Sequence, residues 1–259
     1  MNPYILFRIS GLEGVLVSAD KTEFETPGDD LVERVQIRQS GKAIDGMQFF
    51  LKNDQVINDS VISAIEKKAR IFLVNVNGEM CPFISSFDLK IEQTYDPVIE
   101  NLGALRLSGS FSISFSAALN KISTIDKFKR LFELQSPRPN ADDIYTLLYH
   151  IMTIGNVVTR FLMQYELLLT LVAQNRLQKE VSDFVRDKYN PSLSSNRIDF
   201  HPTRKTDKHG NPLGYDEDEI TYTRNLLGHN DVTLEINDSD VLKMSTTLTQ
   251  VLYFALNNV

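Results

Sequence analysis

The residues best suited to chemistry lie near the end of the chain, in a six-residue segment that begins with Arg224 and Asn225 and ends at His229. Arginine is a permanent planar cation that binds phosphate through two parallel hydrogen bonds. Histidine has an ordinary pKa near neutrality, so it can act as a general acid or base. RNA cleavage without a metal needs a base for the 2′-hydroxyl, an acid for the leaving 5′-oxygen and positive charge at the phosphate. The segment therefore predicts acid–base chemistry at a phosphodiester.

Helical geometry limits how these side chains can act together. Asn225 and His229 are four positions apart and share one helix face, so Asn225 can orient His229 or bond the substrate. Arg224 and His229 are five positions apart, which separates them by about 140° around an ideal helix. Either the long Arg224 side chain reaches around the helix, or a second copy of the chain completes the cleft. Gly228 disfavours a helix and is expected to mark close packing against that copy.

A basic cluster precedes this segment and contains Arg204, Lys205, Lys208 and His209. It falls within residues 190–215, where several prolines and glycines predict a long stretch without regular structure. Loops of that length are usually functional or disordered. The cluster is therefore either a solvated connector or an RNA-binding surface.

The second half of the chain has helical periodicity. Apolar residues three and four positions apart predict one long helix, on which Arg160 and Glu166 are expected to form a buried or interfacial pair. The predicted helices cover residues 125–134, 140–173, 178–189 and 239–256, with another from about 216 through the motif. Together they predict an all-α bundle over residues 123–259.

The first half is rich in strand patterns. The clearest is Leu107 to Ser116, in which apolar residues alternate with serines. A β-branched run at 71–76 is followed by Asn77-Gly78, a typical hairpin turn. The other predicted elements are strands within residues 4–17, 31–38, 46–51 and 83–93 and a helix over 59–70. The fold class predicted for the whole chain is α+β multidomain, with a mostly antiparallel β-domain over residues 1–120, a sandwich or partly open barrel, before the bundle.

The motif on its late helix resembles the HEPN superfamily, whose pattern is Arg, a polar residue, three further residues and His. Arg224, Asn225 and His229 match it position by position. The resemblance covers roughly residues 123–259. It implies a metal-independent endoribonuclease of a toxin–antitoxin or anti-phage defence system, acting as a homodimer whose two motifs share one cleft. It also implies RNA as substrate, no cofactor, and an antitoxin or a sensor or effector protein as partner, which the β-domain would bind or sense.

Composition limits the other classes of function. The chain has 259 residues, a net charge of -7 and a single cysteine, Cys81. An acidic chain must bind RNA through a local patch. One cysteine permits no disulfide within the chain and no cysteine-rich zinc site, so a cytoplasmic protein without a metal is expected. Met1 to Ser10 lacks the features of a signal peptide, and charges within the apolar residues 144–173 argue against a membrane span.

Two other functions fit parts of the sequence. In a non-catalytic binding or dimerisation module, Arg224 would pair with Asp218 or Glu219, Asn225 would be a structural amide and His229 a surface or capping residue. A nucleotidyl- or phosphotransferase would need a metal-binding carboxylate pair or a phosphate loop, and neither is evident. The acidic run from Asp216 to Glu219 is explained by the first turn of a helix, where negative charge is favourable.

Overall fold

The computed structural model describes residues 2–10, 15–17, 22–40, 43–80, 88–95, 121–134, 138–203, 205–206, 209–211, 213–228 and 237–258. The chain divides into two compact units. The first comprises Met1–Gln135 and Asp142–Tyr149, and the second comprises Ser136–Ala141 and His150–Val259. The protein is mixed α+β, with an antiparallel sheet in the first unit and mainly helices in the second, as the sequence predicts.

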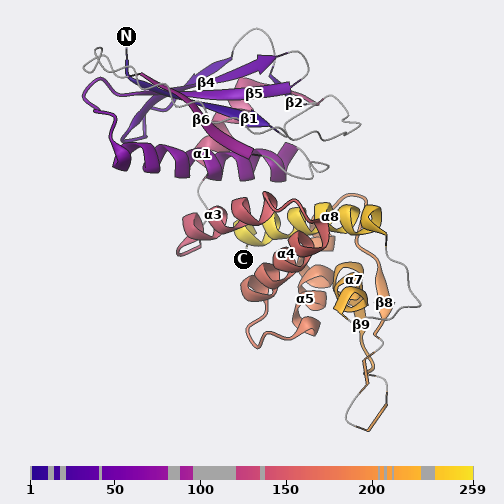
Figure 1. Ribbon diagram of the computed structural model, residues 1–259. Coiled ribbons are helices and arrows are strands. Elements are labelled where there is room, and N and C mark those ends of the chain that lie inside the picture. The colour runs from indigo at the N-terminus through magenta and orange to yellow at the C-terminus, as the bar shows by residue number, and fades with distance from the viewer. Residues whose placement is uncertain are drawn as a thin grey trace. The chain divides into compact units, whose positions relative to one another are not determined.

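The first unit is built on a five-stranded antiparallel sheet (Figure 1). Its strands, in spatial order, are β3 (Glu23–Glu25), β4 (Val32–Ser40), β5 (Ala43–Leu51), β1 (Tyr4–Ser10) and β6 (Asp88–Tyr95). A bulge in β4 after Val32 shifts the alternation, so that Val32, Val35 and Ile37 are all buried. Two short strands, β2 (Val15–Val17) and β7 (Lys121–Ser123), form a separate parallel pair.

Helix α1 (Asp59–Met80) overturns the strand predicted at 71–76 and its hairpin turn. Its apolar side chains follow helical spacing, and Phe72, Leu73 and Val76 are all buried. The side chain of Asn75, also buried, donates to the carbonyl oxygen of Leu131 at 2.9 Å. Packing against other elements thus outweighs the β preference of the branched residues, which is weak and depends on context. Figure 1 shows α1 lying along one face of the sheet.

Helix α2 (Ile125–Glu133) has the bounds expected from the sequence but packs within the first unit. The rings of Phe128 and Phe132 lie 6.3 and 5.9 Å from that of Phe72, and Phe132 also lies 5.7 Å from Phe24. The first unit therefore extends through α2, past the predicted limit at residues 120–123, and also includes Asp142–Tyr149. The predicted strand Leu107 to Ser116, and Cys81, lie outside the described residues.

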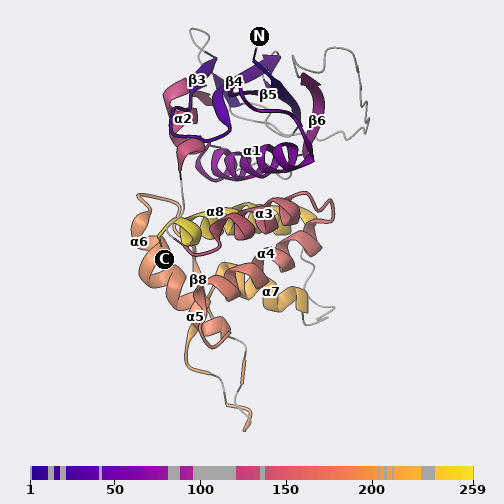
Figure 2. The ribbon, with the colours of Figure 1, turned by 90° about the vertical axis from the view of Figure 1, so that its left-hand side faces the viewer.

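The prediction of one long helix over 140–173 is wrong, because two helices occupy that range. They are α3 (Ala141–Met152) and α4 (Val157–Val172). Asn156 ends the interruption by accepting a hydrogen bond from the Thr159 backbone nitrogen at 2.8 Å, as a helix N-cap does. The second unit also contains α5 (Gln178–Phe184), the π-helix η1 (Val185–Tyr189), α6 (Asn190–Ser192), α7 (Glu219–Gly228) and α8 (Asp238–Asn258). Figures 1 and 2 both show α4 beside α8, where each buries an apolar stripe.

The segment predicted to lack regular structure over 190–215 instead contains α6 and most of a hairpin. Strand β8 (Phe200–Pro202) pairs antiparallel with β9 (Asp216–Asp218). The pairing extends beyond the strands, because the Thr203 nitrogen donates to the Tyr215 oxygen and the Leu213 nitrogen to the Lys205 oxygen. Figure 2 shows this hairpin running away from the helices. In the part of the chain that the structure describes, none of the helices has the length and apolar character needed to cross a membrane.

Candidate functional site

Helix α7 carries the first residues of the motif, and Asp218 fixes where that helix begins. The Asp218 carboxylate accepts hydrogen bonds from the backbone nitrogens of Ile220 and Thr221 at 3.0 and 3.1 Å. It also accepts from the hydroxyls of Ser182 and Thr221 at 2.8 and 2.6 Å. Burial raises the pKa of Asp218, and these four hydrogen bonds oppose that rise. The helix predicted to start near Asp216 therefore starts after β9, with Asp218 as its cap.

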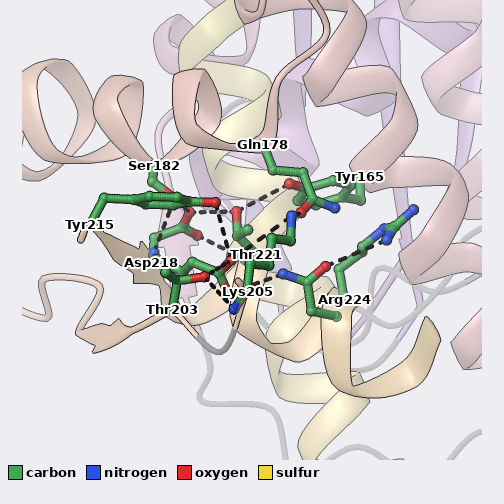
Figure 3. A network of polar contacts seen from close by, with 11 residues as sticks. Tyr165, Gln178, Ser182, Thr203, Lys205, Tyr215, Asp218, Thr221 and Arg224 are labelled. Atoms are coloured by element: carbon green, nitrogen blue, oxygen red, sulfur yellow. Dashed lines mark hydrogen bonds and ion pairs between the residues drawn. The ribbon is translucent and has the colours of Figure 1, made fainter. Parts of the chain in front are cut away.

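Glu217 is a second buried carboxylate, and its contacts join the hairpin to the motif. Figure 3 shows the polar network to which its partners Thr203, Lys205 and Tyr215 belong. Its Oε1 atom accepts from the Thr203 hydroxyl at 2.7 Å and lies 4.0 Å from the Lys205 ammonium. The Tyr215 hydroxyl donates to the same oxygen at 3.5 Å. Its Oε2 atom accepts from the side-chain nitrogen of Asn225 at 3.0 Å. A buried carboxylate needs such partners because desolvation of an unpaired charge is costly.

Asn225 links Glu217 to Arg224. Its amide nitrogen donates to Glu217, so its oxygen faces the other way and accepts from Arg224 Nη1 at 3.4 Å. Only 9% of Asn225 is exposed, so its side chain faces the interior of the unit. The structural role that the sequence left open for this amide is thus present, with Glu217 as its partner.

Arg224 brings positive charge to the surface beside α4. A third of its side chain is exposed, and its Nη2 atom lies 3.8 Å from Glu166 Oε1. The guanidinium carbon lies 5.9 Å from the centre of the Tyr165 ring, within the range of a cation–π contact. The carboxylate partner of Arg224 is therefore Glu166 on α4, whereas the sequence suggested Asp218 or Glu219.

The remaining predicted site residues are only partly described. His229, Arg204 and Lys208 lie outside the described residues. Lys205 is half-buried; its ammonium donates to Gln178 Oε1, and burial lowers its pKa. His209 is exposed in the hairpin. Lys205 thus takes part in the polar network around Glu217.

The prediction that Arg160 pairs with Glu166 is wrong. Arg160 is buried and donates to the Ser245 hydroxyl and the Ile154 carbonyl oxygen, each at 3.3 Å. Glu166 is half exposed and lies near Arg224 and Arg176. The two residues are six positions apart, about 240° around a helix, so they face different directions.

Several residues of the site were not expected from the sequence. Glu217 and Asp218 belong to an acidic run that the sequence assigns to an exposed helix start, yet both are buried. Tyr165 and Thr221 bring their hydroxyl oxygens within 3.1 Å of each other across α4 and α7. Burial is the main cause of the raised pKa of Tyr165, and this keeps its hydroxyl protonated. The sequence signal for the role of Asp218 was its position just before the apolar residues of a helix, where an Asp is a typical N-cap.

Among the described residues, no group of three or more His, Cys, Asp or Glu side chains is placed to hold a metal ion. What this arrangement offers chemically is a positive charge held at the surface. The Arg224 guanidinium lies beside the Tyr165 ring, three residues after the buried hydroxyl of Thr221. Comparison with protein-family models, with curated proteins and with solved structures finds no match to the chain.

Proposed function

We propose that the chain is a metal-independent endoribonuclease of the HEPN type, in which Arg224 and His229 act on one phosphodiester. The observation that supports this most is the chain of contacts from Glu217 through Asn225 to Arg224. It fixes a guanidinium at the surface of α7, five positions before the only histidine that follows it in sequence. Preorganised positive charge is what a developing phosphorane requires.

The proposed reaction transfers the phosphate to the neighbouring 2′-oxygen. His229 removes the proton of the 2′-hydroxyl, and the 2′-oxygen then attacks phosphorus. The bond to the 5′-oxygen breaks, and that oxygen takes a proton from water, which regains one from the protonated His229. The products are a 2′,3′-cyclic phosphate end and a 5′-hydroxyl end. Arg224 stabilises the charge on the non-bridging oxygens.

In this proposal Asn225 positions Arg224 rather than binding RNA. Its two polar ends are already engaged by Glu217 and Arg224. The dimer remains necessary to the proposal because of the 140° separation of Arg224 and His229 on an ideal helix. The first unit would bind or sense the partner that restrains the nuclease, an antitoxin or an effector of anti-phage defence in the cytoplasm.

The test is cleavage of a labelled single-stranded RNA by the full chain in EDTA. We expect wild-type protein to cut, and His229→Ala to fold and assemble normally but lose at least about 100-fold in rate, as expected for removal of a general acid or base. His150→Ala, at an exposed histidine of α3, is the matched control and should retain full activity. Full activity in His229→Ala would exclude the proposal.

A second function is supported by the same contacts. Arg224 and Asn225 are both engaged within the unit, as in a non-catalytic binding or dimerisation module. That function requires purified wild-type protein to leave RNA intact under all conditions. It also requires Arg224→Ala to change the oligomeric state or the free energy of unfolding. Cleavage that depends on His229 would exclude it.

A further inference from the structure

A second arginine meets the carboxylate that faces Arg224. Arg176 Nη2 lies 3.4 Å from Glu166 Oε2, while Arg224 Nη2 lies 3.8 Å from Glu166 Oε1. One carboxylate therefore lies between two guanidinium groups, with one on each of its oxygens. All three side chains reach solvent, with exposed fractions of 65% for Arg176, 50% for Glu166 and 33% for Arg224.

The turn between α4 and α5 holds Arg176 in an unusual backbone conformation. Its φ is +56°, in the left-handed region that residues other than glycine seldom adopt. Glu180 fixes this turn by accepting hydrogen bonds from the backbone nitrogens of the residues on either side of Arg176, at 3.0 Å from Asn175 and 3.3 Å from Leu177. The Asn175 side chain also donates to Glu180 at 2.6 Å. These contacts lower the pKa of Glu180, that from the Asn175 side chain most, and keep it charged.

Such a conformation persists only where the surrounding structure determines it, and it is often found at functional sites. Here the effect is to direct Arg176 towards the carboxylate that Arg224 also approaches. Exposed ion pairs of this kind contribute little to stability, so stability alone does not explain the arrangement. A guanidinium binds phosphate with the same forked geometry as it binds a carboxylate.

We propose that Arg176 and Arg224 together bind two neighbouring phosphates of single-stranded RNA, and that Glu166 occupies their place until RNA displaces it. This inference rests on the proposed ribonuclease function and adds a substrate-binding residue to it. Arg224 contacts the phosphate that reacts, and Arg176 contacts the next one. Because the protein has a net charge of -7, a local pair of arginines is the means by which it would hold a polyanion. Glu166 then weakens binding of isolated phosphate.

The probe is a short 2′-O-methyl oligoribonucleotide, which cannot be cleaved because its 2′-hydroxyl is blocked. Its affinity is measured by fluorescence anisotropy over a series of salt concentrations. Arg176→Gly removes the guanidinium but suits the left-handed turn, so the turn should survive. We expect this variant to bind several-fold more weakly, with a salt slope smaller by about 0.7, the value for one phosphate contact to a single strand. We expect Glu166→Gln to bind several-fold more tightly.

Two controls separate these effects from general ones. Asn196→Gly changes another residue with a left-handed φ, +55°, and should bind as wild type does. Lys188→Ala removes an exposed positive charge of η1 and should leave the salt slope unchanged. Circular dichroism and thermal unfolding of Arg176→Gly confirm that the fold is retained.

The results separate this inference from the ribonuclease proposal. If wild-type protein cuts RNA but Arg176→Gly binds the probe normally, the inference is wrong and the proposed function stands. If Arg176→Gly binds weakly but wild-type protein never cuts, the binding site is supported and the nuclease is not. Unchanged or weaker binding by Glu166→Gln would overturn the role of Glu166. Absence of binding by wild-type protein would overturn the inference entirely.

Discussion

Glu217 joins the hairpin to the helix that carries the motif. Its two oxygens contact different elements, with Thr203 and Lys205 of the hairpin on one side and Asn225 of α7 on the other. The sequence singles out Arg224 and Asn225 as candidate site residues, because their types and spacing are distinctive. It cannot identify Glu217, because a glutamate among acidic neighbours looks the same whether it is exposed or buried. Only the pairing of β8 with β9 places it in the interior.

Removal of the Glu217 side chain should destabilise the second unit. In Glu217→Ala, Lys205 loses a counter-charge and Thr203 and Asn225 lose an acceptor inside the protein. We expect the free energy of unfolding to fall by about 1–3 kcal/mol, the cost of leaving a buried polar group without its hydrogen-bond partner. Chemical denaturation measures it. Asp216→Ala, at the exposed neighbouring residue, should change it by less than about 0.5 kcal/mol. Equal effects in the two variants would contradict the assigned role.

Asp218 should give the stability of the protein a defined dependence on pH. Its pKa is raised by burial in the folded state, so the folded state holds the proton more tightly than the unfolded chain. Stability from this group is greatest below about pH 4, the ordinary pKa, and is lost as the pH rises through the folded pKa. The wild-type free energy of unfolding, minus that of Asp218→Asn, should therefore fall as the pH increases from 4. A difference that increases with pH would contradict the raised pKa.

At the scale of elements, helices were predicted well where a single apolar stripe marks them and poorly where packing determines their ends. The closing helix, α8, lies within two residues of its predicted limits. The run at 71–76 was assigned to a strand because of its branched residues. It is part of α1, where consecutive residues such as Phe72, Leu73 and Val74 are all buried. The break between α3 and α4 was missed because apolar spacing continues through Gly155. Periodicity detects a buried face but not an interruption within it.

The cap of α4 should account for part of its stability. Asn156 accepts a hydrogen bond from the Thr159 backbone nitrogen, which otherwise has no partner within the helix. We expect Asn156→Ala to lower the free energy of unfolding by about 1 kcal/mol. The matched variant is Thr170→Ala on the exposed side of the same helix, for which a change below about 0.5 kcal/mol is expected. Thermal denaturation of both would show whether the interruption is capped as described.

At the scale of the whole molecule, the sequence predicted two parts of different class, and the structure has two compact units. The boundary differs because α2 and most of α3 belong to the first unit, where aromatic contacts with α1 and β3 hold α2. A change in pattern near residue 120 marks where helices begin, but it does not show which sheet or bundle a helix joins. Long-range packing decides this and leaves no local signature in the sequence.

The proposed homodimer can be tested by mixing two inactive variants. If the cleft combines Arg224 of one copy with His229 of the other, Arg224→Ala and His229→Ala chains are each inactive alone. A mixture allowed to exchange subunits should regain measurable cleavage, because one cleft in each mixed dimer retains both side chains. The rate of RNA cleavage before and after exchange measures this. No recovery, with mixed dimers shown by mass spectrometry, would argue that each copy contains a complete site.

Metal-independent cleavage of RNA by Arg224 and His229 would leave product ends of a defined chemical kind. A single-stranded RNA is incubated with the full chain in EDTA, and the ends are identified by mass spectrometry. We expect 2′,3′-cyclic phosphate and 5′-hydroxyl ends with wild-type protein, and neither with His229→Ala. Intact RNA with wild-type protein, or the same ends with His229→Ala, would contradict the proposed chemistry.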